Sequence, residues 1–406
     1  MAHLKPSDLR AGARLLTEGT RSVTRLVEGV HQAVHQRIGL PTGAEPGRTR
    51  GLTGLIYRSI EEVTGWVGRG TDRALAAWEI QVDPAHETRP ASAQREAALA
   101  ALNGVMGDRL AAQGNPLATT MGLWLDGQRL DLQLPLALPL PQARPTVVLM
   151  LHGLCMNDVQ WNSRADGVAT NHGQALAAAL DATPLYLRYN SGLHISDNGR
   201  QLAALLDTLH TAWPVPLTRL VLLTHSMGGL VARSAVAVAQ QEARPWLQAL
   251  RQIVFLGTPH HGAPLERAGH WLHTVLGSTP YSAPFAALAR LRSAGITDLR
   301  WGHVRDQDWQ YQDRFATAHD QRQPLPLPVG VECYAIAATT AARRGRLAER
   351  LLGDGLVPLR SALGQHDLPA FDLQFPAARQ AVFYRTGHLA LLSSAAVQAQ
   401  LLAWLR

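Results

Sequence analysis

Cysteine and lysine are almost absent from this chain of 406 residues. It holds two cysteines, Cys155 and Cys333, and a single lysine, Lys5. Two cysteines are too few for a disulfide framework, and by themselves they cannot form a zinc site. The basic residues are otherwise all arginine, which we attribute to coding bias and not to function. We therefore expect no structural metal, and nothing in the sequence calls for a cofactor.

Long apolar runs are also lacking. The longest uncharged stretches are Ala268–Ala289 and Leu389–Leu405, and both are interrupted by polar residues. A membrane-spanning helix needs about 20 mostly apolar residues, which neither stretch offers. The opening residues, MAHLKPSDLRAGARLL, lack the apolar core of a signal peptide. We expect a cytoplasmic protein, and we leave open a peripheral membrane contact through the N-terminal helix.

The charge is concentrated near the N-terminus. The net charge is +7, and residues 1–60 contain nine basic and four acidic residues, leaving the rest nearly neutral. After residue 60 no basic stripe with interleaved aromatic residues occurs, which argues against nucleic-acid binding. Apolar residues make up 46% of the chain and charged residues 17%, enough for a sizeable core.

Residues 1–115 form the first predicted region, and it is helical. A helix is expected over 6–38, where apolar residues recur every seven positions at Leu9, Leu16, Val23 and Val30. Such a narrow seam predicts packing against another helix. Two more helical segments are expected, one ending near Ile80 and one spanning about 91–112. We expect the seam to dock on the rest of this chain, because it lacks the aromatic residues common at interfaces. Pairing with a second copy and contact with an anionic membrane are the alternatives.

Residues 116–406 form the second predicted region, of the α/β class. Met121–Leu132 reads as two short strands around Asp126-Gly127, a strong hairpin signal. Short, continuous apolar runs then alternate with helical patterns along the chain. That alternation is typical of a mostly parallel, doubly wound sheet covered by helices on both faces.

Arg219–Val236 carries the strongest chemical signal. An apolar strand runs into His225-Ser226-Met227-Gly228-Gly229, and a helix follows at once. This strand–turn–helix context is the one that a nucleophile elbow requires. The segment resembles the α/β-hydrolase superfamily, with HSMGG as in many lipases and esterases. One departure is Thr224, which stands where G-x-S-x-G has its first glycine. The resemblance implies that Ser226 is the nucleophile.

A nucleophilic serine needs a base and an acid that orients the base. In this fold the chain order is Ser, then Asp or Glu, then His. His388 directly follows the last apolar strand and is the predicted base; His260, His261, His270, His273 and His366 fit less well. Asp354 is the predicted acid because its GDGLVP segment resembles that of lipase-like families. Asp367 and Asp372 are the rival acids.

Two backbone N–H groups must stabilise the oxyanion. Met227, the residue after the nucleophile, is expected to supply one. The segment His152-Gly153-Leu154 resembles the oxyanion loop of the family, which implies that Leu154 supplies the other. We expect His152 to shape this loop rather than to act as a base.

LGTPHHGAP (Leu256–Pro264) resembles a segment of lipase-like proteins that include the PGAP-type GPI-inositol deacylases. It precedes an unusually long connection, so a helical cap insert is predicted over about 263–328. Its large apolar residues suggest a lid or binding element.

The resemblance implies an α/β-hydrolase fold of bacterial lipase or esterase type. The predicted activity is hydrolysis of carboxylic esters, including lipid esters, by Ser226, His388 and Asp354 through an acyl-enzyme. Two alternatives use the same residues: thioester or amide cleavage, and acyl transfer to an alcohol. A third is a catalytically silent interaction module. The sequence does not define the oligomeric state.

Overall fold

The structure is a computed structural model, and it describes residues 5–37, 48–49, 51–81, 92–132, 143–165, 168–263, 292–310, 320, 322–342 and 353–406. The chain divides into two compact units. The smaller comprises Met1–Arg95 with Ala112–Leu117, and the larger comprises Glu96–Ala111 with Ala118–Arg406. None of the helices in the described ranges is long and apolar enough to cross a bilayer.

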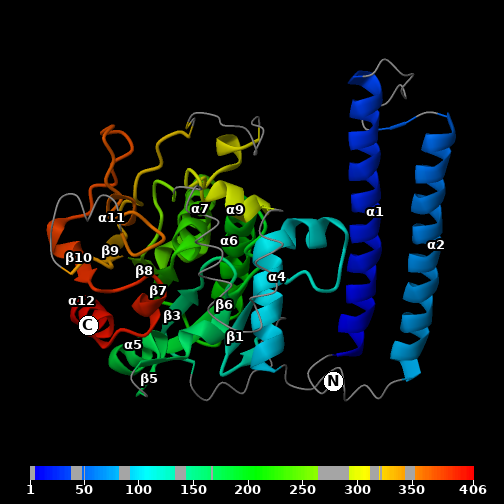
Figure 1. The fold of residues 1–406 in the computed structure, drawn as a ribbon. Helices are drawn as coiled ribbons and strands as arrows, with labels where there is room; N and C mark the ends of the chain where they lie inside the picture. The colour runs from blue at the N-terminus through cyan, green and yellow to red at the C-terminus, as the bar shows by residue number, and fades with distance from the viewer. Residues whose placement is uncertain are drawn as a thin grey trace. The chain divides into compact units, whose positions relative to one another are not determined.

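The smaller unit is built on two long helices, α1 (Pro6–Arg37) and α2 (Gly51–Gln81), which lie side by side (Figure 1). Polar groups join them: the carboxylate of Asp72 accepts hydrogen bonds from Arg10 at 2.8 Å and from Arg14 at 2.5 Å. This contact corrects the predicted apolar seam, since Leu9 and Leu16 are 46% and 75% exposed. Arg10 and Arg14 lie on the side of α1 that contacts α2, and these two leucines lie on the other side of the helix. The side chains of Val23 and Val30 lie outside the described residues.

An eight-stranded sheet organises the larger unit, in the order β10-β9-β8-β7-β3-β6-β1-β2. All neighbouring strands from β10 to β6 in this order are parallel. Strand β1 is antiparallel to both of its neighbours, β6 and β2. The strands are β1 (Gly122–Leu125), β2 (Gln128–Arg129), β3 (Thr146–Leu151), β6 (Thr183–Arg188), β7 (Arg219–His225), β8 (Leu250–Leu256), β9 (Glu332–Thr339) and β10 (Gln380–Tyr384). The predicted hairpin is confirmed, with Asp126 and Gly127 both at positive φ, as its tight turn requires.

Helices cover both faces of this sheet (Figure 1). The helices of the larger unit, besides α4 (Ala93–Ala112), are α5 (His172–Leu180), α6 (Ile195–Ala212), α7 (Met227–Gln241), α9 (Ala294–Asp298), α11 (Leu359–Ala362) and α12 (Ala395–Leu405). The 3₁₀ helices are η1 (Asp158–Trp161), η2 (Pro245–Gln248), η5 (Asp306–Asp308), η6 (Ala377–Arg379) and η7 (Leu389–Leu392), and β4 (Ser163–Ala165) pairs with β5 (Val168–Thr170).

Successive residues of the central strands point to opposite core layers. Leu149 of β3 and Leu222 of β7 pack with α6 and α7, whereas Met150 and Leu223 pack with α5 and α12. Because both faces are covered, these strands are apolar throughout rather than alternating. The predicted mostly parallel, doubly wound α/β sheet is confirmed.

Helix α4 and the predicted cap insert are the two segments where the structure differs from the prediction or describes only a part. Glu96–Ala111, most of α4, packs with the larger unit, although the prediction placed residues up to 115 in the helical region. Of the cap insert predicted over 263–328, residues 264–291, 311–319 and 321 lie outside the described residues. The described remainder includes α9 and η5.

Candidate active site

Ser226 occupies a sharp turn between β7 and α7. Its backbone has φ 54° and ψ −125°, a left-handed conformation that is rare for a residue with a Cβ. Its N–H donates to the carbonyl of Leu256 on β8 at 2.8 Å, which ties the turn to the sheet. Ser226 is 3% exposed. The geometry is that of a nucleophile elbow, where local strain places the serine hydroxyl at the carboxyl end of the sheet.

Close approaches around the elbow explain its small residues. A Cβ on Gly228 would lie 2.6 Å from the carbonyl oxygen of His152, and one on Gly229 would lie 2.1 Å from the hydroxyl of Thr258. Thr224, the departure from the motif, belongs to β7 and not to the turn. Its hydroxyl donates to the carbonyl of Val254 at 3.0 Å, so this β-branched residue is accommodated within the sheet.

His388 and Asp354 form a buried pair. Nδ1 of His388 donates to Oδ2 of Asp354 at 2.6 Å, and the two residues are 4% and 3% exposed. The other carboxylate oxygen, Oδ1, accepts from the backbone N–H groups of Leu356 at 3.0 Å and Val357 at 2.8 Å. In addition, the His388 N–H donates to the carbonyl of Asp354 at 3.0 Å. The carboxylate is therefore fixed from both sides, and it fixes the imidazole.

Glycines make this position of Asp354 possible. Gly353 has φ +46° and Gly355 has φ +95°, both in the region that side chains with a Cβ rarely adopt. A Cβ on Gly353 would lie 2.1 Å from the carbonyl oxygen of Val357. The GDG sequence thus forms the tight loop that presents the carboxylate to His388.

The loop after β8 brings the elbow and the pair together. Leu256 accepts the Ser226 N–H, and a Cβ on the next residue, Gly257, would lie 3.1 Å from the His388 ring. His225, directly before Ser226, has its ring 4.7 Å from that of His388. Among the described residues, the Ser226 hydroxyl makes no direct hydrogen bond to His388. An apo site often has such a bond long or poorly aligned.

His225 is a supporting residue that sequence reasoning did not single out. Its Nε2 donates to the backbone carbonyl of His388 at 3.2 Å. Burial lowers the pKa of His225 well below its usual value, which favours the neutral ring. Its place next to the elbow serine was the available signal.

The rival residues lie apart from this arrangement. Asp367 is an exposed side chain that pairs with Arg360 at 2.6 Å, and the carboxylate of Asp372 accepts a long bond from the N–H of Gln374. His260 is buried against Phe255, and burial lowers its pKa well below the usual value. His261 and His366 contact each other edge to face, whereas His270 and His273 lie outside the described residues.

The predicted oxyanion donors flank the serine. A Cβ on Gly153 would lie 3.1 Å from Cβ of Ser226, so the His152–Leu154 loop lies directly against the elbow. Within the described residues, the Leu154 N–H has no hydrogen-bond acceptor. Met227 is the first residue of α7, a position whose N–H has no acceptor inside the helix. Leu154 and Met227 are 1% and 0% exposed.

His152 holds the predicted oxyanion loop in place. Its ring stacks on Tyr189 with centroids 4.2 Å apart, its Nδ1 lies 2.8 Å from the Gly153 carbonyl, and its Nε2 accepts from the Tyr189 N–H at 3.3 Å. Burial lowers the pKa of His152 to about 4, which keeps the ring neutral. Cys155 is buried in the same loop, and burial raises the pKa of its thiol, as expected of a small core residue.

Helix α4 packs against two loops, one containing Cys155 and the other containing Asn190. A Cβ on Gly104 would lie 2.2 Å from Sγ of Cys155, and one on Gly107 would lie 1.9 Å from Oδ1 of Asn190. Asn190 in turn donates to the carbonyl of Gly107 at 2.9 Å. The described part of the insert joins this wall, since a Cβ on Gly295 of α9 would lie 2.9 Å from Cε of Met227.

The mostly parallel eight-stranded sheet, with a serine at a strained strand–helix turn, defines a protein of the α/β-hydrolase fold. Residues 142–322 match the family model of the PGAP1-like alpha/beta domain. The chain has the α/β-hydrolase fold, and residues 142–322 are similar to the PGAP1-like alpha/beta domain, as the predicted resemblance implies. A comparison with curated proteins gave no match.

Solved structures of similar fold include the mature Bacillus licheniformis lipase BlEst2, with 16% identity and a TM-score of 0.40, covering 70% of this chain and 98% of that one. Carboxyl esterase 2 of Tuber melanosporum has 14% identity and a TM-score of 0.34, with coverage of 64% and 75%. The Pyrobaculum calidifontis esterase has 13% identity and a TM-score of 0.33, with coverage of 65% and 76%. Likenesses this distant establish nothing about the substrate of this chain.

Proposed function

We propose that this protein is a serine hydrolase that cleaves carboxylic esters, lipid esters among them, through an acyl-enzyme. One observation carries the proposal. The left-handed Ser226 stands at the carboxyl end of the sheet, directly after His225, whose ring contacts the His388 of a buried His388–Asp354 pair. A plain turn serine needs neither this backbone strain nor a neighbouring imidazole already oriented by a carboxylate.

The first half of the reaction forms the acyl-enzyme. Oγ of Ser226 attacks the ester carbonyl carbon while Nε2 of His388 accepts the hydroxyl proton. Asp354 accepts the Nδ1 hydrogen bond, keeps Nε2 free as the base, and stabilises the imidazolium that forms. The tetrahedral intermediate then collapses, and the alcohol leaves with the proton from Nε2. Water repeats these steps to release the acid.

The charge on the carbonyl oxygen develops beside Leu154 and Met227. Both of their N–H groups are assigned as donors to this oxygen because both lie at the elbow without other acceptors among the described residues. The N-terminus of α7 adds a favourable partial positive charge at the same point.

Labelling by a fluorophosphonate probe tests the proposal directly. The unchanged chain should be labelled, with the adduct mapped to Ser226, and should hydrolyse p-nitrophenyl esters. Ser226→Ala should abolish both signals while the thermal transition persists. Ser59→Ala, on the surface of α2, is the matched control and should keep both. Labelling at another serine, or unchanged turnover by Ser226→Ala, would refute the assignment.

The lipid-ester part of the proposal rests on eight large apolar residues of the insert, between Trp271 and Leu291. These lie outside the described residues. If some of them contact the acyl chain, kcat/KM should rise about tenfold from butyrate to octanoate, since each fully buried methylene contributes up to ~0.8 kcal/mol. A steady fall from acetate to octanoate would limit the proposal to short-chain esters. Parallel assays of matched thioesters test the alternative chemistry.

A further inference from the structure

Helix α2 presents an apolar face to solvent. Six large side chains on it are between 42% and 73% exposed: Leu55, Ile56, Ile60, Val63, Trp66 and Val67. At 100° per residue these positions fall on one side of the helix, and over 13 residues they extend about 18 Å along its axis. We call these six residues the α2 apolar face. A contiguous exposed patch of this kind marks an interaction surface.

The face lies opposite the contact with α1. Glu61 of α2 accepts from Arg25 of α1 at 3.0 Å, and Asp72 binds Arg10 and Arg14. A Cβ on Gly68 would lie 2.3 Å from the methyl group of Thr17, which shows how closely the two helices approach. Helix α2 thus directs its small and charged residues toward α1. The α2 apolar face therefore has no partner in α1.

Arginines border the α2 apolar face along one edge. Arg58, Arg69 and Arg73 are exposed there together with Glu62, whereas Glu61 and Asp72 bind arginines of α1. The guanidinium of Arg69 lies 5.8 Å from the centre of the Trp66 ring, so the basic edge and the apolar face are continuous. An apolar stripe with a tryptophan and flanking arginines is typical of helices that lie in a membrane interface.

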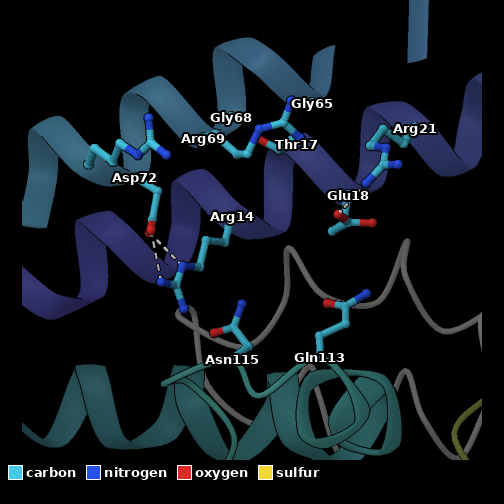
Figure 2. Close-up of a pocket in the computed structure, with 11 residues that line it drawn as sticks. Arg14, Thr17, Glu18, Arg21, Gly65, Gly68, Arg69, Asp72, Gln113 and Asn115 are labelled. Atoms are coloured by element: carbon cyan, nitrogen blue, oxygen red, sulfur yellow. Dashed lines mark hydrogen bonds and ion pairs between the residues drawn. The ribbon is translucent and has the colours of Figure 1, made fainter. Parts of the chain in front are cut away.

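A cavity of about 500 Å³ adjoins this edge and adds further guanidinium groups. Figure 2 shows the lining residues Arg14 and Arg21 on α1 and Arg69 on α2. Asp72 is already paired with Arg14, and Glu18 with Arg21. Together with Arg73, four arginines line the cavity, and of the acidic residues that the structure describes only these two do. The cavity therefore has an excess of positive charge that suits an anionic headgroup.

We propose that the α2 apolar face binds the surface of an anionic lipid bilayer. The six apolar side chains enter the boundary between headgroups and acyl chains, and the arginine edge contacts lipid phosphates. Charge favours this occupant over a second copy of the chain, because an antiparallel two-fold pairing through this face would bring two arginine edges together with little acidic charge to offset them. The proposal is independent of the hydrolase chemistry.

A fluorescent probe on the face gives the first test. Both native cysteines are buried, so Val63→Cys in the full chain offers one accessible thiol for an environment-sensitive dye. Val329→Cys is the matched control, because Val329 is 95% exposed on the larger unit. Vesicles of equal parts phosphatidylcholine and phosphatidylglycerol should raise the emission of the dye at position 63 only. Phosphatidylcholine alone should give a much weaker response.

Sedimentation with the same vesicles gives the second test. The double variant Val63→Gln/Trp66→Gln should lower partitioning at least about tenfold. Arg69→Gln/Arg73→Gln should lower binding to the anionic vesicles, and salt should do the same in the unchanged chain. The controls Leu368→Gln and Arg251→Gln alter exposed residues of the larger unit, and they should leave vesicle binding unchanged.

Three results would overturn the proposal. Equal sedimentation of the unchanged chain and the double variant would show that the face does not contact lipid. A dimer detected by light scattering that Val63→Gln/Trp66→Gln dissociates would assign the face to a second copy. A large loss of thermal stability in that variant, without vesicle binding by the unchanged chain, would assign it to an intramolecular contact.

Discussion

Nδ1 of His388 lies 2.6 Å from Oδ2 of Asp354, and this contact is shielded from water, with both residues almost fully buried. The hydrogen bond fixes the tautomer of the imidazole and leaves Nε2 as the available base. Because Oδ1 is already held by two backbone N–H groups, the carboxylate cannot turn away from His388. The pair is thus oriented before any substrate arrives.

Replacing this carboxylate by an amide should nearly abolish turnover. Asp354→Asn keeps the size of the side chain but removes the charge that stabilises the imidazolium and favours the wrong tautomer. We expect kcat for p-nitrophenyl esters to fall on the order of 10⁴-fold. Asp367→Asn, at an exposed residue paired with Arg360, is the control and should leave kcat unchanged. If Asp367→Asn were the inactive variant, the acid would have to be reassigned.

The parts of the site that were predictable depend on local sequence. The elbow at Ser226, the glycines around Asp354 and the HG dipeptide before Leu154 each impose a backbone shape within a few residues. The apolar strands were equally readable, because a parallel sheet covered on both faces needs continuous apolar runs. Such features need no knowledge of distant contacts.

The parts that were not predictable depend on contacts between distant segments. Sequence reasoning did not single out Gly104 and Gly107, and only the fold shows that Cys155 and Asn190 occupy the space beside them. Likewise, the heptad pattern of α1 suggested an apolar contact, whereas arginine–carboxylate pairs join it to α2. A periodic pattern identifies a face, but it does not say which face the partner meets.

Gly257 is predicted to position the imidazole of His388, the proposed base. Its φ is +57°, and an added Cβ would lie 3.1 Å from the His388 ring and 2.9 Å from Leu391. Gly257→Ala should therefore displace the ring and lower kcat about 10- to 100-fold. Gly330→Ala is the matched control: Gly330 has φ +80° but no atom within 4 Å of the new Cβ. Both variants should lose some stability from backbone strain, and only Gly257→Ala should lose turnover.

Helix α4 is predicted to support the oxyanion loop through Gly104. A Cβ there would lie 2.8 Å from both the backbone N and Cα of Cys155, the residue after Leu154. Gly104→Ala should push this loop away from Ser226 and lower kcat about 100-fold, with a smaller effect on KM. Gly12→Ala, in helix α1 with no atom within 4 Å, should leave kcat unchanged. If a folded Gly104→Ala variant kept the wild-type kcat, α4 would have no role in supporting this loop.

Acid should destabilise the protein well above the pH at which carboxylates titrate. Four buried imidazoles have lowered pKa values because burial disfavours their charged form: His152, His172, His225 and His260. The unfolded chain, where a histidine has a pKa near 6.5, then binds more protons than the folded one. Their stabilising effect is present above the unfolded pKa of about 6.5 and is lost progressively as the pH falls below it.

The size of this effect can be stated for His152, whose pKa is lowered to about 4. Between pH 7 and pH 5 it alone should reduce the free energy of unfolding by about 2 kcal/mol, and the other three should add to the loss. Carboxylates with lowered pKa values act in the same direction, but only below about pH 4. Urea unfolding at pH 7, 6 and 5, followed by near-UV circular dichroism, measures the change. His152→Gln should reduce the pH dependence by its share, whereas equal stability at pH 7 and 5 in the unchanged chain would show that these rings are not held neutral.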